Sequence, residues 1–582
     1  NFSRVAKICT FANKHNRMAG LVVDSRERKL QLRTAVRELS DRGLVLAAKW
    51  AAEQAAGLGT VGLETSVDHT YSNPSFKAAE IDLQGEEAEI EEDQWLLAKS
   101  FFEVKEHRRA AYALKDCKSR RSVFLRCFAT FLAGEKRKEE ELAEKSNGTL
   151  GRADVTNAEL PTLRSELAEI CQADTVDPFC LYIYGVVLKE LELKGQAREI
   201  LVRSVNAYPW NWSAWHDLAA VCPDRETVDS LPLRAHWMRP FFDAHISAEH
   251  LQYDDAVRGY TNLQASYPKS TYVLAQNATA KYQLRAFDSA QELFQELQKI
   301  EPCRLEHMDV YSNMLYVKEA KADLSYLAHN AALIDKYRPE TCCIIGNYYS
   351  LRGQHEQAVL YFQRALRLNR NYLSAWTLIG HEFVEMKNTP AAIQAYRTAV
   401  DINSKDFRAW YGLGQTYEIL HMPFYALYYY RKAATIRPYD ARMWCAMAEC
   451  YSKLARFNEA IKCYERAEGN SDREGIALLK LARLYKQLEN LDKAAIYYKK
   501  NLDRRDAEEM DGHDTVECLL FLAHFCKTAG RVSDTEKYCS RLLDYAGPEK
   551  EEAKALLREM RSTQQKLAGR MPSPQGQGDK AF

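Results

Sequence analysis

The chain has 582 residues, of which 80 are Lys or Arg and 80 are Asp or Glu, so its formal net charge is zero. This balance, and the lack of any apolar run of about 18 residues, argue against a nucleic-acid-binding protein and against a membrane protein. With 46% hydrophobic and 27% charged residues it is a folded chain, and its length alone would indicate about four domains.

The first part of the chain carries weak helical patterns separated by polar segments. Residues 1–24 show no pattern that assigns them. Residues 25–133 are expected to hold N-terminal helical repeats, indicated by Ala35, Ala47 and Trp50 and by a second group from Ala98 to Leu114. They are interrupted by a loop over residues 61–94 that contains the acidic run Glu86–Asp93. Residues 134–160 read as a charged flexible insertion.

A period of 34 residues dominates the rest of the chain. The repeat that starts at Phe407 carries the complete tetratricopeptide pattern at positions 4, 7, 8, 11, 20, 24, 27 and 32, namely Trp410, Leu413, Gly414, Tyr417, Ala426, Tyr430, Ala433 and Pro438. The register continues through repeats that start at residues 237, 271, 305, 339, 373, 407, 441 and 475. An earlier repeat over Leu181–Pro209 loses the register at Pro223–Pro232.

These repeats predict an all-α fold. Small residues at positions 8, 20 and 27 let helices approach closely, and large residues at the other positions fill the space between them. Because one helix pair cannot bury its own apolar face, we expect a superhelical solenoid of about thirteen helix pairs instead of four domains. It comprises middle repeats over 161–304, C-terminal repeats with a peptide-binding groove over 305–548, and a terminal helix with a disordered tail over 549–582.

The sequence carries no active-site signature. The nearest approach to a metalloprotease helix, His381-Glu382 followed by Glu385, lacks the second His and falls inside a repeat. The 15 Cys residues lack the spacing of a zinc site and mostly read as small buried residues of a reducing compartment. Since the repeats leave no room for a catalytic domain, we expect no enzyme, no metal and no cofactor.

Tetratricopeptide stacks offer a concave groove lined by the first helix of each pair, near positions 2, 5, 9 and 12. In the central repeats these positions and their neighbours hold Asn347, Ser350, Thr377, His381, Glu382, Tyr411, Gln415 and Glu418. Acidic residues among aromatics suit an extended peptide that bears Arg or Lys, although ordinary solvated helix faces are an open alternative. A clamp for a terminal carboxylate is disfavoured because Cys343 stands where a Lys is needed.

The stretch from Ser325 to Ala433, which includes GNYYSLR and GQTYEILHMPFYALYYYR, closely resembles subunit eight of the anaphase-promoting complex, or cyclosome. The similarity extends more weakly through Leu96–Leu114 and Phe179–Leu193 to about residue 470, and it therefore covers most of the folded chain. The resemblance implies a non-catalytic scaffold subunit of a ubiquitin ligase that marks mitotic regulators for degradation in the cell cycle, present in nucleus and cytoplasm.

The resemblance also implies partners and site residues. The family subunit is a homodimer joined through its N-terminal repeats, here Leu30–Gln54 and Leu96–Cys117, and contacts other tetratricopeptide and scaffold subunits. Its groove captures the C box of WD-repeat coactivators, the Fizzy and Fizzy-related proteins, through an essential Arg. Matching that groove makes Asn347 and Glu382 the Arg partners, with His381, Tyr411, Gln415 and Glu418 beside them. A co-chaperone or trafficking adaptor that binds another peptide is the alternative.

Overall fold

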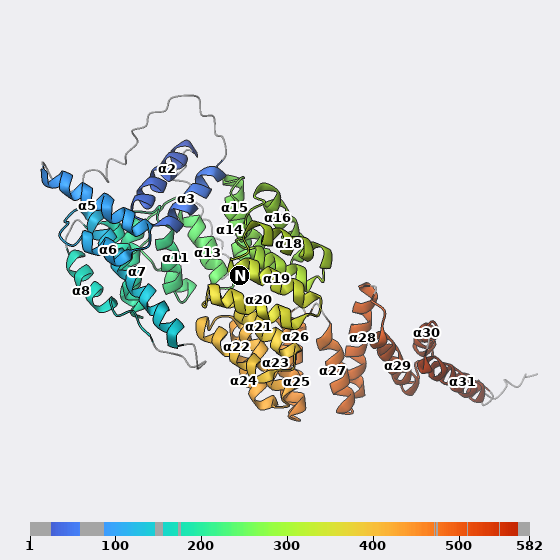
Figure 1. Cartoon of the computed structure of the whole chain (residues 1–582). Helices are drawn as coiled ribbons and strands as arrows, with labels where there is room; N and C mark the ends of the chain where they lie inside the picture. Colours follow the sequence, from blue (N-terminus) through green and yellow to red (C-terminus); the bar gives the residue numbers. More distant parts are fainter. Residues whose placement is uncertain are drawn as a thin grey trace, which may run out of the picture. The chain divides into compact units, whose positions relative to one another are not determined.

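The chain folds into helices that pack as antiparallel pairs (Figure 1). The computed structural model describes residues 25–58, 86–145, 155–172, 176–470, 472, 475–508, 510–545 and 547–568, and these residues contain no β-strand. Their contacts divide the chain into two units, one up to Met314 and one from Leu315. None of the described helices is both long enough and apolar enough to cross a bilayer. The all-α solenoid that the sequence predicts is confirmed.

Unit 1 begins with two helix pairs and a longer helix before the regular repeats. Its helices are α2 (Ser25–Asp41), α3 (Val45–Gly57), α5 (Glu86–Glu103), α6 (His107–Ala113), α7 (Arg120–Lys145), α8 (Leu160–Ile170), α9 (Pro178–Glu190), α10 (Lys194–Ala207), α11 (Trp212–Val221), α12 (Arg225–Asp229), α13 (Arg239–Glu249), α14 (Tyr253–Ser266), α15 (Thr271–Gln283) and α16 (Phe287–Ile300). The five-residue α12 lies where the sequence loses the repeat register.

Unit 2 continues the 34-residue register. The helix α17 (Met308–Val317) contains the boundary between the two units. It is followed by α18 (Lys321–Ile334), α19 (Pro339–Leu351), α20 (His355–Leu368), α21 (Leu373–Glu385), α22 (Thr389–Ile402), α23 (Phe407–Ile419), α24 (Pro423–Ile436), α25 (Ala441–Lys453), α26 (Phe457–Gly469), α27 (Ile476–Gln487), α28 (Leu491–Ala507), α29 (His513–Thr528), α30 (Val532–Leu542) and α31 (Pro548–Ala568). The helix boundaries agree with the repeat starts that the sequence predicts.

Two expectations about the polar segments of unit 1 are wrong in part. The acidic run from residue 86 to residue 93 belongs to α5 and is not a loop. Glu91 accepts a hydrogen bond from the Ser119 backbone nitrogen at 2.7 Å and Glu92 pairs with Arg121, so both carboxylates have partners near the start of α7. The remainder of the expected loop, up to residue 85, lies outside the described residues.

The charged insertion is also partly helical, because α7 runs to Lys145. Opposite charges alternate at helical spacing there. Arg137 Nε lies 3.1 Å from Glu141 Oε1, and Lys138 Nζ lies 3.3 Å from Glu135 Oε2. Such pairs support the last part of α7, which has few apolar residues. Residues 146–154 and the expected disordered tail from residue 569 lie outside the described residues.

Small and aromatic residues interlock inside each helix pair. Three of the tyrosines at position 24 are at most 1% exposed, namely Tyr396, Tyr430 and Tyr498. A Cβ atom on Gly414 would stand 2.4 Å from Cε1 of Tyr430, so the glycine at position 8 leaves the space that the ring fills. Many of the chain's 33 tyrosines therefore serve packing, as their positions in the repeat predict.

The turn inside each of these repeats has the same left-handed backbone conformation at one residue. One residue with positive φ follows the first helix every 34 residues, namely Leu251, Arg285, Glu319, Gly353, Lys387, His421, Ala455 and Glu489. Only one of these eight is glycine, the residue that adopts this conformation without steric cost. The backbone geometry of the repeat therefore overrides residue preference at this position.

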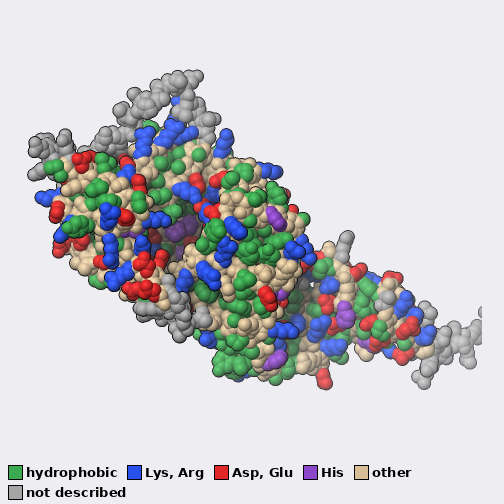
Figure 2. Space-filling model, viewed as in Figure 1, with side chains coloured by type: hydrophobic (Ala, Val, Ile, Leu, Met, Phe, Trp, Pro, Cys, Tyr) green, Lys and Arg blue, Asp and Glu red, His purple; other side chains and the backbone are tan. Residues whose placement is uncertain are grey.

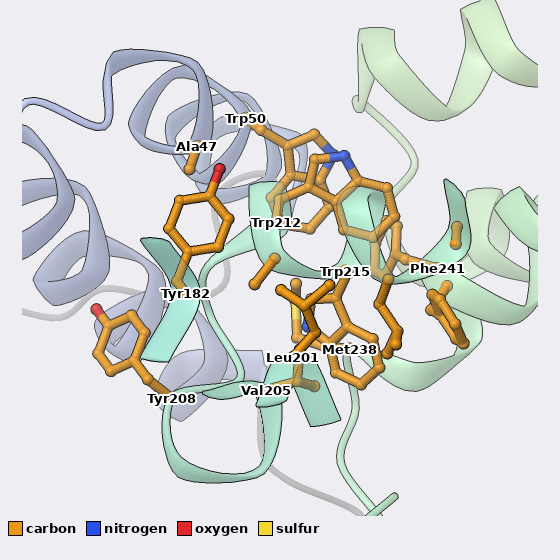
Figure 3. Close-up of a cluster of buried hydrophobic side chains, with 14 of the residues drawn as sticks. Ala47, Trp50, Tyr182, Leu201, Val205, Tyr208, Trp212, Trp215, Met238 and Phe241 are labelled. Carbon is orange, nitrogen blue, oxygen red and sulfur yellow. The ribbon is translucent and has the colours of Figure 1, made fainter. Parts of the chain in front are cut away.

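Helix α3 packs against the first helices of three later pairs in unit 1. Trp50 stacks on Trp212 of α11 with ring centroids 4.7 Å apart (Figure 3). It also meets Phe241 of α13 and Tyr272 of α15 edge to face. Ser270 Oγ donates to Gln54 Oε1 at 2.7 Å. Aromatic burial thus fixes α3 on helices about 160 residues or more further along the chain.

Ion pairs also join α3 to the segment that follows α16. The Arg304 side chain is only 4% exposed, and its Nη1 lies 3.7 Å from Glu53 Oε1 of α3 and 3.0 Å from Glu301 Oε2. Lys49 of α3 pairs with Glu306. Burial raises the pKa of Glu53, and the Arg304 and Lys49 charges oppose that rise. A buried guanidinium needs such carboxylates, because an unpaired charge in this position would be strongly destabilising.

Candidate functional site

The predicted groove residues lie on the first helices of three consecutive repeats of unit 2. Asn347 is on α19, His381 and Glu382 are on α21, and the other three predicted residues are on α23. Helix α19 contacts α21, and α21 contacts α23. The structure therefore places all six predicted residues on neighbouring helices, although their immediate surroundings differ.

Glu382 is the buried carboxylate of this site. The residue is 5% exposed, and its Oε1 accepts a hydrogen bond from Ser350 Oγ at 2.6 Å. Its Oε2 lies 2.8 Å from Nδ1 of His355, the first residue of α20. Neither partner is a Lys or Arg, so a hydroxyl and an imidazole orient the carboxylate.

Asn347 lies one helical turn before Ser350 on α19, and it is 2% exposed. Ser350 Oγ also lies 3.3 Å from the hydroxyl oxygen of Tyr316, so the serine connects α17 to the Glu382 carboxylate. An amide, a hydroxyl and a carboxylate thus occupy adjacent positions on α19 and α21. The carboxylate among them offers the acceptors that a planar cationic group needs.

His381 faces a different part of the repeat from its neighbour Glu382. Its Nδ1 lies 2.8 Å from the hydroxyl oxygen of Tyr396, within the same helix pair. Burial, with a smaller contribution from the nearby Arg408 charge, lowers the pKa of His381 to about 4. The imidazole is therefore neutral at physiological pH, and its hydrogen bond to Tyr396 ties α21 to α22.

The three predicted residues of α23 have unlike environments. Tyr411 packs against the ring of Tyr430 at 5.3 Å, and Gln415 is exposed. Glu418 accepts a hydrogen bond from the Tyr430 hydroxyl at 2.8 Å, and its other oxygen lies 2.5 Å from Lys453 Nζ. Because Lys453 already balances it, Glu418 is less suited than Glu382 to receive a second cation.

His355 is the site residue that sequence reasoning missed. The predicted groove positions belong to the first helix of each pair, whereas His355 begins a second helix. Its position three residues after Arg352, the cap of α19, gives no repeat-based signal for a contact with α21. Only the packing of α20 against α21 brings the imidazole to Glu382.

One other group of potential ligands occurs in the described residues. His513, Asp514 and Glu517 of α29 lie close enough to share a cation. Arg483 Nη2 lies 2.5 Å from Glu517 Oε2 and 3.3 Å from Asp514 Oδ1, so the carboxylates already belong to an ion-pair network. This arrangement explains the cluster without a metal ion.

Comparison with known proteins identifies the family. The model of the family described as anaphase promoting complex subunit 8 / Cdc23 matches residues 27–278, and tetratricopeptide models match residues 339–372 and 380–419. The chain is 52% identical over 558 residues to anaphase-promoting complex subunit 8 of Arabidopsis thaliana, covering 92% of this chain and 96% of that protein. The chain belongs to the anaphase-promoting complex subunit 8 family. It is therefore a tetratricopeptide-repeat scaffold subunit of that complex.

A second relative agrees with this assignment, and a solved structure shares the fold. The subunit 8 protein of Dictyostelium discoideum is 47% identical over 584 residues, covering 92% of this chain and 98% of that protein. The crystal structure of the APC/C hetero-tetramer Cut9-Hcn1 has a similar fold, with a TM-score of 0.52 over 80% of this chain and 89% of that one, at 16% identity. The subunit 8 family and the repeat architecture that the sequence predicts are both confirmed.

Proposed function

We propose that this subunit docks the C box of Fizzy and Fizzy-related WD-repeat coactivators on α19, α21 and α23, and so supports the ubiquitination of mitotic regulators. The observation that carries the proposal is the Glu382 carboxylate, which is 5% exposed and is held by Ser350 and His355 without a permanent cation. The C box supplies an Arg, whose guanidinium would satisfy that charge.

The chemistry of the capture follows from the donors and acceptors present. An ionised carboxylate has about four acceptor positions, and Ser350 and His355 use one each. A guanidinium can take the remaining positions through two parallel N–H donors, which a lysine ammonium cannot do in the same geometry. Asn347 lies one helical turn before Ser350 on the same helix.

The test is the affinity of a C-box peptide for the full chain by isothermal titration. Glu382→Gln keeps the size of the side chain and removes the charge, so we expect binding to weaken at least about tenfold, or 1.4 kcal/mol. Glu418→Gln is the matched control on the next first helix and should change affinity less. Equal losses for both variants, or none for Glu382→Gln, would contradict the assignment of the site.

A change in the peptide tests whether binding depends on the positive charge alone or on the paired donors of the guanidinium. We expect that replacement of its Arg by Lys weakens binding to the unaltered chain, because only the guanidinium reaches the carboxylate through paired donors. Against Glu382→Gln the same replacement should matter much less. A Lys peptide that binds as tightly as the Arg peptide would argue for general charge attraction instead of a specific guanidinium site.

We also propose that the subunit is a homodimer that contacts other subunits of the complex in nucleus and cytoplasm. Much of the expected dimer region packs within unit 1, but Val45, Leu46, Val104 and Tyr112 are 69–79% exposed. Exposed apolar side chains of this kind are typical of an interface. Light scattering of Leu46→Glu with Tyr112→Glu should show a monomer, whereas an unchanged dimer would exclude this face.

A further inference from the structure

An exposed apolar ridge lies at the turn between α23 and α24 and along the outer face of α24. We call it the aromatic ridge; it consists of Ile419, Leu420, Met422, Phe424, Tyr425 and Tyr428. Phe424 is 67% exposed, Tyr425 61% and Tyr428 55%. Figure 2 shows hydrophobic side chains gathered where Figure 1 places α24. A contiguous group of exposed aromatics on a folded protein marks an interaction surface.

The neighbouring repeats show that this ridge is not a requirement of the fold. At positions 18, 19 and 22 the preceding repeat has Pro390, Ala391 and Gln394, and the following repeat has Asn458, Glu459 and Lys462. The same backbone positions are thus polar or small in repeats that fold equally well. The aromatic residues of the repeat at 407 therefore need an explanation other than packing within the solenoid.

A second layer of aromatic rings supports the ridge. Tyr417 stacks on Tyr425 at 5.7 Å and on Tyr429 at 5.2 Å, and Tyr428 meets Tyr429 edge to face at 5.2 Å. Arg397 Nη2 donates to the Tyr417 hydroxyl at 3.0 Å. Rings that are held in this way lose little conformational entropy on binding, which favours their use as anchors.

The Lys, Arg, Asp and Glu residues of the chain segment that carries the ridge have one sign. From Ile419 to Tyr439 the chain contains no Asp or Glu, whereas it contains Arg431, Lys432 and Arg437. Arg431 and Lys432 are exposed on α24 one turn after Tyr428, and Lys432 Nζ lies 5.8 Å from the centre of the Tyr428 ring. The exposed face of α24 is therefore aromatic in its first half and basic in its second.

We infer that the aromatic ridge docks a segment of another protein of the complex, one that presents an apolar side chain beside carboxylates. The apolar side chain would lie on Phe424, Tyr425 and Tyr428, and the carboxylates would pair with Arg431 and Lys432. Complementarity in both respects selects an acidic, apolar segment. An anionic membrane fits less well, because juxtamembrane clusters that hold lipid carry about four to eight basic residues.

Photocrosslinking from the ridge identifies its occupant. Tyr428 is replaced by benzoylphenylalanine in the full chain, the assembled complex is irradiated, and the adduct is mapped by mass spectrometry. We expect adducts in a segment of another subunit that combines an apolar residue with Asp or Glu. Adducts on a second copy of this chain, on lipid or on a segment without carboxylates, or no adduct, would overturn the inference. Leu360 is the matched control, since it holds position 22 of its own repeat and is 56% exposed.

Charge reversal then tests the basic half of the face. A synthetic peptide of the mapped segment is titrated into the full chain and into Lys432→Glu, for which we expect at least tenfold weaker binding. Lys462→Glu, at position 22 of the next repeat, should change affinity less than twofold. Equal affinity for all three proteins would overturn the pairing. C-box peptide affinity, measured in parallel, should stay the same in Lys432→Glu, so this test is independent of the groove.

Discussion

Units 1 and 2 are built from the same helix pair but use their first helices differently. In unit 1, α3 lies against α11, α13 and α15, and the single side chain of Trp50 contacts an aromatic ring on each of these three helices. In unit 2, the extensive contacts of α19, α21 and α23 among the described residues are with helices of their own and adjacent repeats. One set of first helices is thus covered by the chain itself, and the other carries the buried Glu382.

The difference shows how one repeat can serve two purposes. Where aromatic residues occupy the first helices, as at Trp212, Phe241 and Tyr272, the face is closed by an apolar partner from the same chain. Where Asn347, Ser350 and Glu382 occupy it, the face presents hydrogen-bonding groups that no apolar helix could satisfy. The side chains of the first helices therefore decide whether a face becomes core or binding site.

Removal of the central ring of unit 1 should have the largest effect. Trp50→Ala deletes a side chain that is 4% exposed and stacks on Trp212, and we expect the free energy of unfolding of unit 1 to fall by about 3–5 kcal/mol. Hydrogen exchange should rise along α11, α13 and α15 and stay unchanged along α19 to α23. The control is Ala56→Ser, at an exposed position of the same helix. Uniform loss of protection in both units would contradict independent stabilisation.

The second-largest effect should be a difference between the units in the stability that each loses at acidic pH. Burial lowers the pKa of both His236 and His245 to about 4, while unit 2 has His381 with a pKa of about 4. Since an unfolded histidine titrates near 6.5, the unfolded state binds more protons below that pH, and stability falls as the pH drops from about 6.5 to about 4. We expect unit 1 to lose more stability than unit 2.

The His245→Gln variant measures the contribution of His245 to the loss of unit 1 stability at acidic pH. His245 stacks on His216 at 5.3 Å and packs against Trp212, so its protonation places a charge among rings. The variant should reduce the slope of unit 1 stability between pH 6.5 and 4, measured by urea unfolding at each pH. His329→Gln, on an exposed surface of unit 2, controls for the substitution itself. A slope that does not change in His245→Gln would assign the effect to other groups.

The smallest expected effect comes from the left-handed turns. Gly353 has a φ of 73°, and a Cβ atom there would have no neighbour within 4 Å, so Gly353→Ala costs only backbone strain, about 1 kcal/mol. Ala455, at the same position three repeats later, has a φ of 57°, and Ala455→Gly should gain about 0.5 kcal/mol. Thermal unfolding of unit 2 measures both. Changes of the same sign would exclude this backbone explanation.

The fold followed from the sequence because its determinants repeat. Gly414, Ala426 and Tyr430 recur in type at fixed positions, and local packing within a pair obeys those positions. The position of α3 could not be predicted in this way. Its contacts join Trp50 to Tyr272 and Gln54 to Ser270, and a 34-residue pattern contains no information on contacts across such separations.

The site was predictable to the level of helices but not of contacts. The repeat pattern placed both Glu382 and Glu418 on first helices, and it does not distinguish the surroundings of one carboxylate from those of the other. The structure distinguishes them through residues of other helices, since Lys453 of α25 pairs with Glu418 and His355 of α20 with Glu382. Such pairings depend on which side chain reaches across between helices, and a single sequence does not encode that as a pattern.

The contacts of α3 also have a mechanical consequence. Residues 45–57 are bound near Ser270 and Arg304, so much of unit 1 forms a loop closed by side chains. Under tension from its two ends, a solenoid held only by neighbouring pairs extends one pair at a time. Unit 2 should yield in this gradual way. Unit 1 should instead resist until Trp50 leaves its ring stack, and then lengthen in one large step.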